Sequence, residues 1–308
     1  MPKNLPKRFT DEAAARQHLE GLLWPDGPSC PHCGVVNEAS RIAGGRKGLL
    51  FCNACRKQFS VTVGTVYERS KVPLHIWLYA NHLLCASKKG ISSQQLARML
   101  GVTVKTAWFM SHRIRETWVP ASGSGPLGGE GKIVEADETE ISPSRKSRPR
   151  KRSQNKKFVA LVERGGRVRS KVITGAEYPI GIEVRDALYR NVDRKTALHT
   201  DGAQHYKYTM PNHESVDHDK AFARTTDTGE RVHTNSAEGY FSIFKRGLVG
   251  TYQHMSSQHL HRYLAEFDFR MNHRVKLGYS DDMRADKALE GIVGKRLTYR
   301  RPNETTHA

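Results

Sequence analysis

Long hydrophobic runs are absent from this sequence of 308 residues. The most apolar stretch, His75–Ala86, is interrupted by Asn81 and His82 and is too short to span a bilayer. The first ten residues are polar and basic and lack the apolar core of a secretion signal. We therefore expect no membrane segment and a reducing, intracellular setting.

Acidic residues are in the minority, with 31 Asp and Glu against 50 Lys and Arg, which gives a formal net charge of +19. A basic excess of this size favours a polyanionic partner, because each neutralised phosphate releases condensed counterions. The sequence also lacks the glycine-rich phosphate loop of nucleotide hydrolases, so no nucleotide-driven step is indicated. Composition therefore indicates a nucleic acid as the partner, but charge alone says nothing about catalysis.

Cysteine is scarce, yet four of the five cysteines form two C-x-x-C pairs, Cys30 with Cys33 and Cys52 with Cys55. In a reducing compartment such pairs are typical of metal sites rather than of disulfides. Two pairs at this spacing complete a closed tetrahedral site of four thiolates, which predicts a structural Zn²⁺ ion. Because so short a segment has little core, metal binding would supply its folding energy.

The segment Ile91–Trp108 predicts two helices around a tight turn at Gly101. Ser92 or Ser93 can cap the first helix, and Thr103 can cap the second. We expect the second helix to be a recognition helix that enters the major groove of DNA. The side chains expected to face outward are those of Lys105, Thr106, His112, Arg113 and Arg115. An ordinary helical hairpin would show the same pattern, but the preceding cysteine pairs favour DNA binding.

A stretch rich in Gly, Ser and Pro at residues 120–129 predicts a linker, after which the pattern changes. Strands are expected at 132–136, 158–163, 168–174 and 197–200, and helices at 184–190, 236–248 and 257–274. This order predicts an α/β fold in which helices cover a mixed sheet.

Two aspartates follow predicted strands in this second half. Asp137 comes directly after the strand 132–136, and Asp201 ends the strand 197–200. Acidic side chains at the ends of neighbouring strands can converge on Mg²⁺ or Mn²⁺, which prefer hard oxygen ligands. For Asp201 alone, an ordinary Asp-Gly turn is the better explanation of the residue.

A third acidic candidate, Glu238, lies on a predicted helix whose polar side also carries Asn235 and Lys245. Asn235 with Glu238 three residues later also fits a capping box, in which both side chains satisfy backbone N–H groups. The helix alone leaves these two interpretations equal. Three carboxylates holding two metal ions would support in-line displacement at a phosphodiester without a general-base histidine.

Taken in order, these motifs resemble bacterial insertion-sequence transposases of the DDE class that carry an N-terminal zinc ribbon, relatives of the eukaryotic Merlin elements. The resemblance extends from about Trp24 to Arg274. Its motifs are Cys30-Pro-His-Cys33-Gly34, Cys52-Asn-Ala-Cys55, Lys105-Thr-Ala-Trp108, Asp137-Glu-Thr-Glu-Ile141, Thr200-Asp201, His233-Thr-Asn-Ser-Ala-Glu238, Lys245-Arg-Gly-Leu-Val-Gly-Thr-Tyr252 and the helix His259–Arg274. Each motif is weak alone, and the ordered set is specific.

The resemblance implies a ribonuclease H-like catalytic domain with Asp137 and Asp201 as the first two metal ligands. Glu238 precedes Lys245 by seven residues, which matches the usual glutamate-then-lysine pattern of these enzymes. Some relatives have an asparagine as the third residue, so Asn235 is the alternative. We favour Glu238 as the third catalytic residue, because a carboxylate binds Mg²⁺ better than an amide does.

The resemblance also implies binding to terminal inverted repeats, followed by DNA cleavage and strand transfer. The partner would be double-stranded DNA, bound by a homodimer or higher oligomer in the cytoplasm of a bacterium, associated with the nucleoid. The candidate DNA-binding residues are Lys105, Arg113, Arg115, Lys245 and Arg246. The basic run at 144–157 is a further candidate for phosphate contact, against a solvated loop as the alternative.

Three other functions remain open at this stage: a DNA-binding regulator without catalysis, a structure-specific nuclease of the same fold, and a transposase that no longer mobilises an element. The expected organisation is an N-terminal helix (1–24), a zinc ribbon (25–68), a helix-turn-helix region (69–118), a linker (119–130), the catalytic domain (131–278) and a C-terminal tail (279–308).

Overall fold

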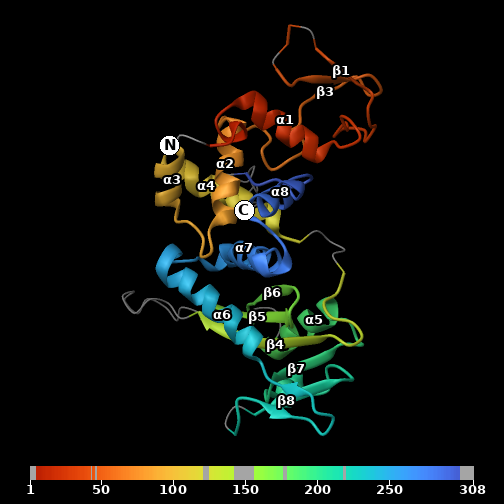
Figure 1. The fold of residues 1–308 in the computed structure, drawn as a ribbon, viewed down its shortest axis with the longest axis vertical. Coiled ribbons are helices and arrows are strands. Elements are labelled where there is room, and N and C mark those ends of the chain that lie inside the picture. The colour runs from red at the N-terminus through yellow and green to blue at the C-terminus, as the bar shows by residue number, and fades with distance from the viewer. Residues whose placement is uncertain are drawn as a thin grey trace, which may run out of the picture. The chain divides into compact units, whose positions relative to one another are not determined.

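The computed structural model describes residues 5–42, 44–45, 47–120, 125–141, 156–175, 179–217 and 220–298. The chain divides into two compact units, one formed by Met1–Val119 with Tyr279–Ala308 and the other by Pro120–Gly278 (Figure 1). Among the described residues, no helix has both the length and the apolar character needed to cross a membrane.

The first unit begins with a helix and a small sheet. Helix α1 (Glu12–Leu23) starts where the Asp11 carboxylate accepts the backbone N–H of Ala14. The antiparallel sheet has the order β1-β2-β3 and comprises β1 (Ala39–Arg41), β2 (Leu50–Cys52) and β3 (Gln58–Phe59). The buried core of this sheet is small and consists of Cys30, Leu50, Cys52 and Phe59.

The predicted pair of helices around Gly101 is present as α3 (Ser93–Leu100) and α4 (Val104–Trp118), which follow α2 (Leu74–Ala86). The Ser92 hydroxyl accepts the N–H of Gln95 and so caps α3, and Thr103 caps α4 in the same way. Gly101 has a φ of 67°, a left-handed conformation that glycine adopts without steric cost. Local residue types therefore determine both helix starts and the turn.

The region expected to be a tail from residue 279 instead contains helix α8 (Asp281–Glu290) over its described part. Asn81 on α2 donates its side-chain N–H to the carbonyl oxygen of Ala285 at 2.9 Å. Arg284 on α8 donates to the carbonyl oxygen of Cys85 at 2.9 Å. Helix α8 thus belongs to the first unit, and its buried residues are Arg284, Ala285, Ala288 and Leu289.

The second unit is built on a five-stranded mixed sheet of order β6-β5-β4-β7-β8. Its strands are β4 (Ile133–Ile141), β5 (Lys156–Glu163), β6 (Val168–Ile173), β7 (Ala197–Asp201) and β8 (His213–Val216). β4, β5 and β6 pair antiparallel, whereas β7 and β8 run parallel to β4. The predicted mixed sheet is confirmed, with two differences: β8 was not expected, and β4 extends beyond the predicted strand 132–136.

Helices cover both faces of this sheet (Figure 1). On one face, α6 (Asn235–Gly247) and α7 (Leu260–Asn272) bury an aromatic cluster that includes Phe158, Phe241 and Phe244. On the other face, α5 (Ile180–Asn191) packs on Val134, Ala136 and neighbouring apolar residues. The shorter elements are η1 (Lys7–Phe9), η2 (Gln204–Tyr206), η3 (Leu248–Tyr252), η4 (Ser257–His259), η5 (Val275–Leu277), β9 (Arg224–Thr225) and β10 (Arg231–Val232).

The described end of the predicted linker 119–130 belongs to the second unit. Leu127 is buried in the core beneath α5. The Leu127 N–H donates to the carbonyl oxygen of Asn191 at 2.7 Å, and the Leu127 carbonyl oxygen accepts the N–H of Asp193 at 2.9 Å. A single leucine in a polar stretch therefore docks this segment, which composition alone does not reveal.

Candidate functional site

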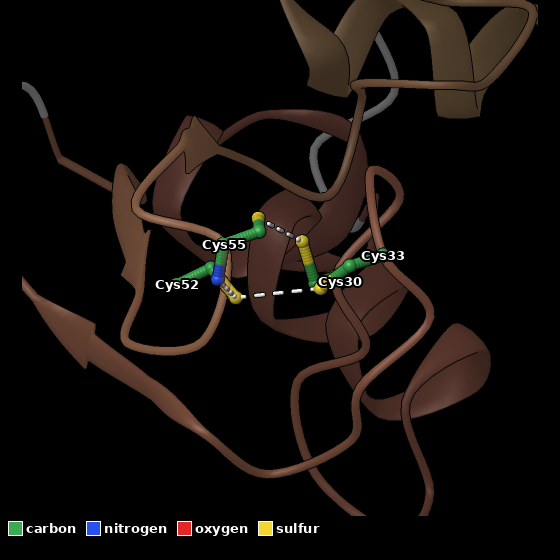
Figure 2. Close-up of side chains that lie close together, drawn as sticks. All are labelled: Cys30, Cys33, Cys52 and Cys55. Atoms are coloured by element: carbon green, nitrogen blue, oxygen red, sulfur yellow. Dashed lines mark hydrogen bonds between the residues drawn. The ribbon is translucent and has the colours of Figure 1, made fainter.

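The four paired cysteines come together at one point of the small sheet in the first unit (Figure 2). Their sulfur atoms all lie within 4.8 Å of one another. The Sγ atoms of Cys30 and Cys55 are 3.7 Å apart, as are those of Cys33 and Cys52. Four sulfurs at about 2.3 Å from a central zinc ion in a tetrahedron would be separated by about 3.8 Å. The geometry therefore fits a closed site of four cysteine thiolates, of the kind that holds Zn²⁺.

The backbone around this site directs N–H groups at the sulfurs. Burial opposes ionisation of Cys30, but hydrogen bonds from the backbone N–H groups of His32 and Cys33 and from the thiols of Cys33 and Cys52 lower its pKa to about 6. The pKa values of Cys33 and Cys55 are raised. The N–H of Cys55 is directed at Cys52 Sγ, 3.5 Å away. Backbone N–H groups that turn towards sulfur stabilise the negative charge that a metal ligand carries.

In the second unit, Asp137 and Asp201 lie on adjacent parallel strands. Ala136 on β4 is in register with Thr200 on β7, so the next residue along each strand is one of the two aspartates. Asp137 thus lies inside β4 rather than after the strand, whereas Asp201 is the last residue of β7, as expected. The sequence-based placement of Asp137 was wrong by several residues, but the two aspartates are neighbours.

The direction of the Asp137 side chain follows from its strand partners. Asp137 pairs with Ala160 and Glu135 pairs with Val162 across β5. Both partners belong to the core that α6 and α7 cover. Because directly paired residues of antiparallel strands point to the same face of a sheet, Asp137 and Glu135 both face α6.

Negative charges are concentrated around Asp137. Burial, the charge of Asp201 and the more distant charges of Glu138 and Glu238 together raise the pKa of the Asp137 carboxyl to about 7. The N–H of Glu138, 2.7 Å from Asp137 Oδ1, opposes this rise without cancelling it. A site in which like charges hinder ionisation is a site that a bound cation would stabilise.

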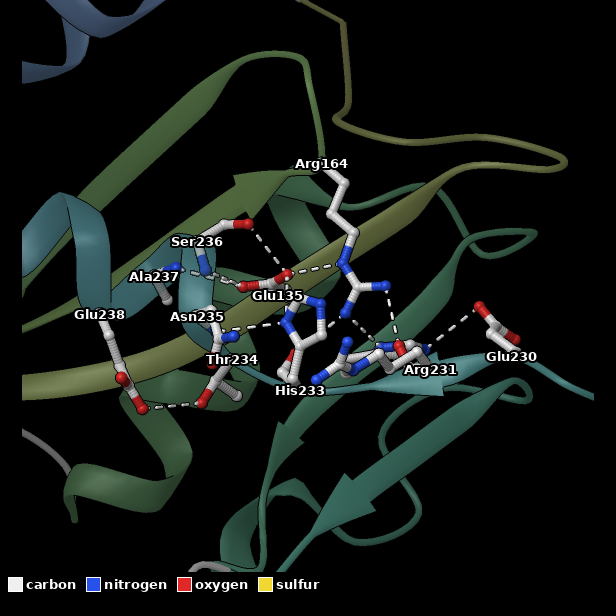
Figure 3. Close-up of polar contacts among 11 residues, drawn as sticks. Glu135, Arg164, Glu230, Arg231, His233, Thr234, Asn235, Ser236, Ala237 and Glu238 are labelled. Atoms are coloured by element: carbon white, nitrogen blue, oxygen red, sulfur yellow. Dashed lines mark hydrogen bonds and ion pairs between the residues drawn. The ribbon is translucent and has the colours of Figure 1, made fainter. Parts of the chain in front are cut away.

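Glu238 is close to this pair but does not touch it. Its exposed side chain projects from the first turn of α6, with Oε1 3.5 Å from the Thr234 hydroxyl (Figure 3). Within the described part of the chain, the four cysteines are the only group of three or more ligand residues gathered within metal-binding distance. The structure therefore pairs Asp137 with Asp201 and leaves Glu238 at a greater distance.

The capping box that the sequence allowed as an alternative at the start of α6 is not present. Thr234 is the N-cap residue, Asn235 is the first residue of the helix, and the side chain of the cap residue makes no bond to the helix backbone. Asn235 is exposed. The interpretation of Asn235 and Glu238 as a pair of caps is therefore wrong, because the helix starts one residue earlier than that motif requires.

Glu138 is an acidic neighbour that sequence reasoning missed. It follows Asp137 directly and pairs through Oε1 with His205 Nε2 of η2. Burial raises the pKa of the Glu138 carboxyl, and the nearby His205 partly offsets that rise. The acidic run that begins at Asp137 was the available signal, but alternation along a strand assigns Glu138 to the opposite face.

A shallow groove of about 580 Å³ runs along α6 from Glu238. Its lining residues are Glu238, Phe241, Ser242, Lys245, Arg246 and Val249. Lys245 and Arg246, both expected to bind DNA, are exposed on this helix. The groove thus has a carboxylate at one end, two cationic side chains and an apolar floor.

Two of the expected DNA-binding side chains on α4 are buried, which corrects the expectation that they face outward. Arg113 lies over the rings of Trp77 and Phe109 and donates to the carbonyl oxygen of Glu68 at 3.0 Å. Arg115 is 2% exposed and donates to the Ser111 hydroxyl at 2.9 Å.

His112 is buried as well, whereas Lys105 at the start of α4 is exposed. Most of α4 contacts neighbouring helices, so its basic residues beyond the first turn serve packing. The basic run 144–157 lies outside the described residues except for its last two positions.

Two regions of the chain match known protein families. Residues 10–58 match the family model described as a transposase zinc-ribbon domain, and residues 125–272 match that of an ISXO2-like transposase domain. A protein of Halobacterium salinarum described as "Uncharacterized protein in transposable element ISH50" is 26% identical over 290 residues, with 86% of this chain and 92% of the relative covered. No solved structure matches the chain.

Proposed function

Since the chain belongs to the ISXO2-like family of insertion-sequence transposases with an N-terminal zinc ribbon, we propose that it cuts and joins DNA at the terminal inverted repeats of its element. The observation that carries this proposal is the pairing of Asp137 and Asp201 on adjacent parallel strands within the matched residues 125–272. A regulator without catalysis would have no use for two neighbouring acids, because the charge of Asp201 opposes the ionisation of Asp137.

We interpret the second unit as a ribonuclease H-like catalytic domain. This interpretation is supported by the mixed sheet of order β6-β5-β4-β7-β8 with helices on both faces. Its central strands β4 and β7 each carry one of the two aspartates. A central strand holds a metal-ligating side chain in a fixed position, because both faces of the sheet are packed.

The donor set fits Mg²⁺ or Mn²⁺. Carboxylate oxygens are the hard ligands these ions prefer, and burial together with the neighbouring charge of Asp201 raises the pKa of Asp137, so a bound cation would favour its ionised form. When bound, two such ions supply activation of a water or 3′-hydroxyl and stabilisation of the departing oxygen. Asp137 and Asp201 provide ligand oxygens from the sheet, and Glu238 provides the third from α6.

Lys245 and Arg246 are proposed to hold the phosphate backbone of the strand being cut. Both are exposed on the helix that carries Glu238, and they line the same groove. Two cations beside a carboxylate cluster attract a phosphodiester towards acids that would otherwise repel it. The strand would follow α6 past Glu238.

The first unit is proposed to bind the element ends as duplex DNA. The four-cysteine site, holding Zn²⁺, would stabilise the ribbon, and α3 and α4 would form a helix-turn-helix with Lys105 at the exposed start of α4. Cleaving and joining two element ends requires two active sites, so we propose a homodimer or higher oligomer on DNA.

The test is cleavage and joining of oligonucleotides that carry the element ends, in Mg²⁺, with the full-length chain. Asp201→Ala should lower both activities by about 10³-fold or more, because removing a ligand forfeits several kcal/mol of transition-state stabilisation. Binding to the same oligonucleotides should persist. The matched control is Asp227→Ala, which removes an exposed aspartate from the β9–β10 connection and should leave activity unchanged. Equal activity of Asp201→Ala and wild type would refute catalysis by this site.

A further inference from the structure

A buried carboxylate lies directly behind the proposed catalytic acids. Glu135 on β4 is completely buried. Its Oε2 accepts the backbone N–H groups of Ser236 at 2.6 Å and Ala237 at 3.2 Å, and its Oε1 accepts the Ser236 hydroxyl at 3.0 Å (Figure 3). Glu135 therefore supplies from the sheet the cap that α6 lacks in its own sequence. A carboxylate at a helix N-terminus is stabilised by free N–H groups and by the helix dipole.

The charge of Glu135 is balanced by Arg164, from the connection between β5 and β6. Arg164 Nε donates to Glu135 Oε1 at 2.6 Å. A second guanidinium nitrogen of Arg164 donates to His199 Nδ1 on β7 at 3.1 Å and to the carbonyl oxygen of His233 at 3.2 Å. A guanidinium only donates, so the His199 nitrogen accepts. Arg164 thus connects β4, β7 and the chain entering α6.

This network has a regular relation to the three proposed ligands. Glu135 precedes Asp137 by two residues on β4, and His199 precedes Asp201 by two residues on β7. Residues two apart on a strand point to the same face, so each network residue lies beside its aspartate.

On α6, Ser236 lies in the same first turn as Glu238, but residues two apart on a helix point to different sides. The Glu135–Arg164 network therefore contacts each of the three elements that carry a proposed ligand. Three of the four hydrogen bonds that Glu135 accepts join β4 directly to the first turn of α6.

We propose that Glu135, with Arg164, is a positioning residue that fixes the start of α6 against β4 and β7 and so determines the metal affinity of the carboxylate site. This inference rests on the proposed function of Asp137, Asp201 and Glu238. Burying an ion pair is costly unless its partners are hydrogen-bonded, and here Glu135 accepts four hydrogen bonds while Arg164 donates four. Glu238 is the ligand that stands apart in the structure, so it depends most on where α6 begins.

The experiment measures Mn²⁺ binding to the full-length, zinc-loaded chain by the electron paramagnetic resonance signal of free Mn²⁺. Glu135→Gln keeps the size of the side chain and removes its charge. It should weaken Mn²⁺ binding by about 10- to 100-fold, the range found when a residue that orients metal ligands is changed. The matched control is Glu140→Gln, which removes another carboxylate of β4. Glu140 lies 3.7 Å from the Lys157 ammonium on β5. This variant should stay within about twofold of wild type.

A purely structural role would lower the melting temperature without changing Mn²⁺ affinity in the folded protein. Mn²⁺ affinity of Glu135→Gln within about twofold of wild type, in a chain with native circular dichroism, would overturn the inference. If Glu135→Gln does not fold, Ser236→Ala decides, because it removes only the hydroxyl bond to Glu135. Ser236→Ala should weaken Mn²⁺ binding about threefold, and wild-type affinity would again overturn the inference.

The two proposals fail in different ways. If the wild-type chain binds no Mn²⁺, or if Asp201→Ala does not abolish that binding, both the proposed function and the positioning role of Glu135 are refuted. If that site exists and responds to Asp201→Ala but not to Glu135→Gln or Ser236→Ala, only the positioning role fails.

Discussion

The two candidate metal sites of this chain are built in opposite ways. The cysteine site takes all its ligands from the short segment Cys30–Cys55, and its sulfurs already lie within 4.8 Å of one another. The carboxylate site takes its ligands from β4, β7 and α6, and Glu238 stands apart from the two aspartates. Tight turns can assemble a site locally, whereas a site drawn from distant strands depends on the whole sheet.

The surrounding cores differ in the same sense. Two of the four buried residues in the ribbon core are the ligands Cys30 and Cys52. The sheet of the second unit is packed on both faces by large apolar clusters. We therefore expect the first site to depend on its metal for folding, and the second to fold without metal.

Removing zinc should have the largest effect. Chelation, or Cys52→Ser, should unfold the ribbon, because structural zinc contributes about 10–16 kcal/mol in comparable sites. Limited proteolysis should then cut within the ribbon and leave the five-stranded sheet of the second unit protected. The control Cys85→Ala, a buried cysteine outside the cluster, should retain zinc. If the metal-free ribbon resisted protease, the cysteine site would not depend on zinc for folding, and the proposed difference between the two metal sites would be refuted.

The next effect concerns the third carboxylate. Glu238→Gln should lower Mg²⁺-dependent cleavage by about 10²- to 10³-fold, because a neutral amide replaces a charged ligand. Asn235→Ala, one turn earlier on the same exposed helix end, should cost less than about tenfold. The cleavage rates of both variants are compared with the rate of wild type, and zinc content serves as the check on folding. The reverse ranking would assign the third position to Asn235.

A smaller effect concerns pH and the core that supports the carboxylate site. Burial raises the pKa of Asp268 on α7 to about 6, although the Tyr240 hydroxyl and the Ser170 N–H bond to its carboxylate. The folded state thus holds this proton more tightly than the unfolded chain. The resulting stabilisation, about 3 kcal/mol at most, is complete below the ordinary aspartate pKa and is lost as pH rises through about 6.

Asp268→Asn should remove this contribution. Urea unfolding of wild type and variant is measured between about pH 3.5 and 7.5, a range of about two pH units on either side of the midpoint of the aspartate titration. The free energy of unfolding of the wild type should fall with rising pH relative to that of the variant. Parallel curves would show that the buried acid does not titrate within this range. Zinc content should not change, since the ribbon lies in the other unit.

The smallest effect separates exposed from buried cations on α4. Lys105→Ala should weaken duplex binding modestly and lower the salt slope of log K by about 1, as expected for one lost phosphate contact. Arg113→Met should instead lower stability and leave the salt slope unchanged in the folded protein, because Arg113 stacks on Trp77. Binding titrations at several salt concentrations test both. An unchanged slope for Lys105→Ala would exclude its phosphate contact.

Local signals in the sequence predicted local structure well. The predicted caps Ser92 and Thr103 and the left-handed Gly101 lie where the helices α3 and α4 begin and end. The spacing of the cysteine pairs predicted their cluster for the same reason, since each pair acts through a tight turn.

Predictions failed where burial depends on contacts distant in sequence. Arg113 and Arg115 were assigned to an outward face, but α4 packs on more than one side and their aliphatic stems lie in the core. The region from residue 279 was expected to be a tail, yet helix α8 packs there and buries Ala285, Ala288 and Leu289. Neither result can be read from a helical pattern alone.

By itself, the sequence determined the cysteine site, the two capped helices of the first unit and the presence of candidate acids on strands, because turns, caps and alternation act within a few residues. Only the tertiary structure decided which acids meet. It placed Asp137 inside β4 beside Asp201 and assigned Glu135, which no motif indicated, to the N-terminus of α6. The reason is that strand register and the docking of a helix on a sheet are set by packing over the whole unit.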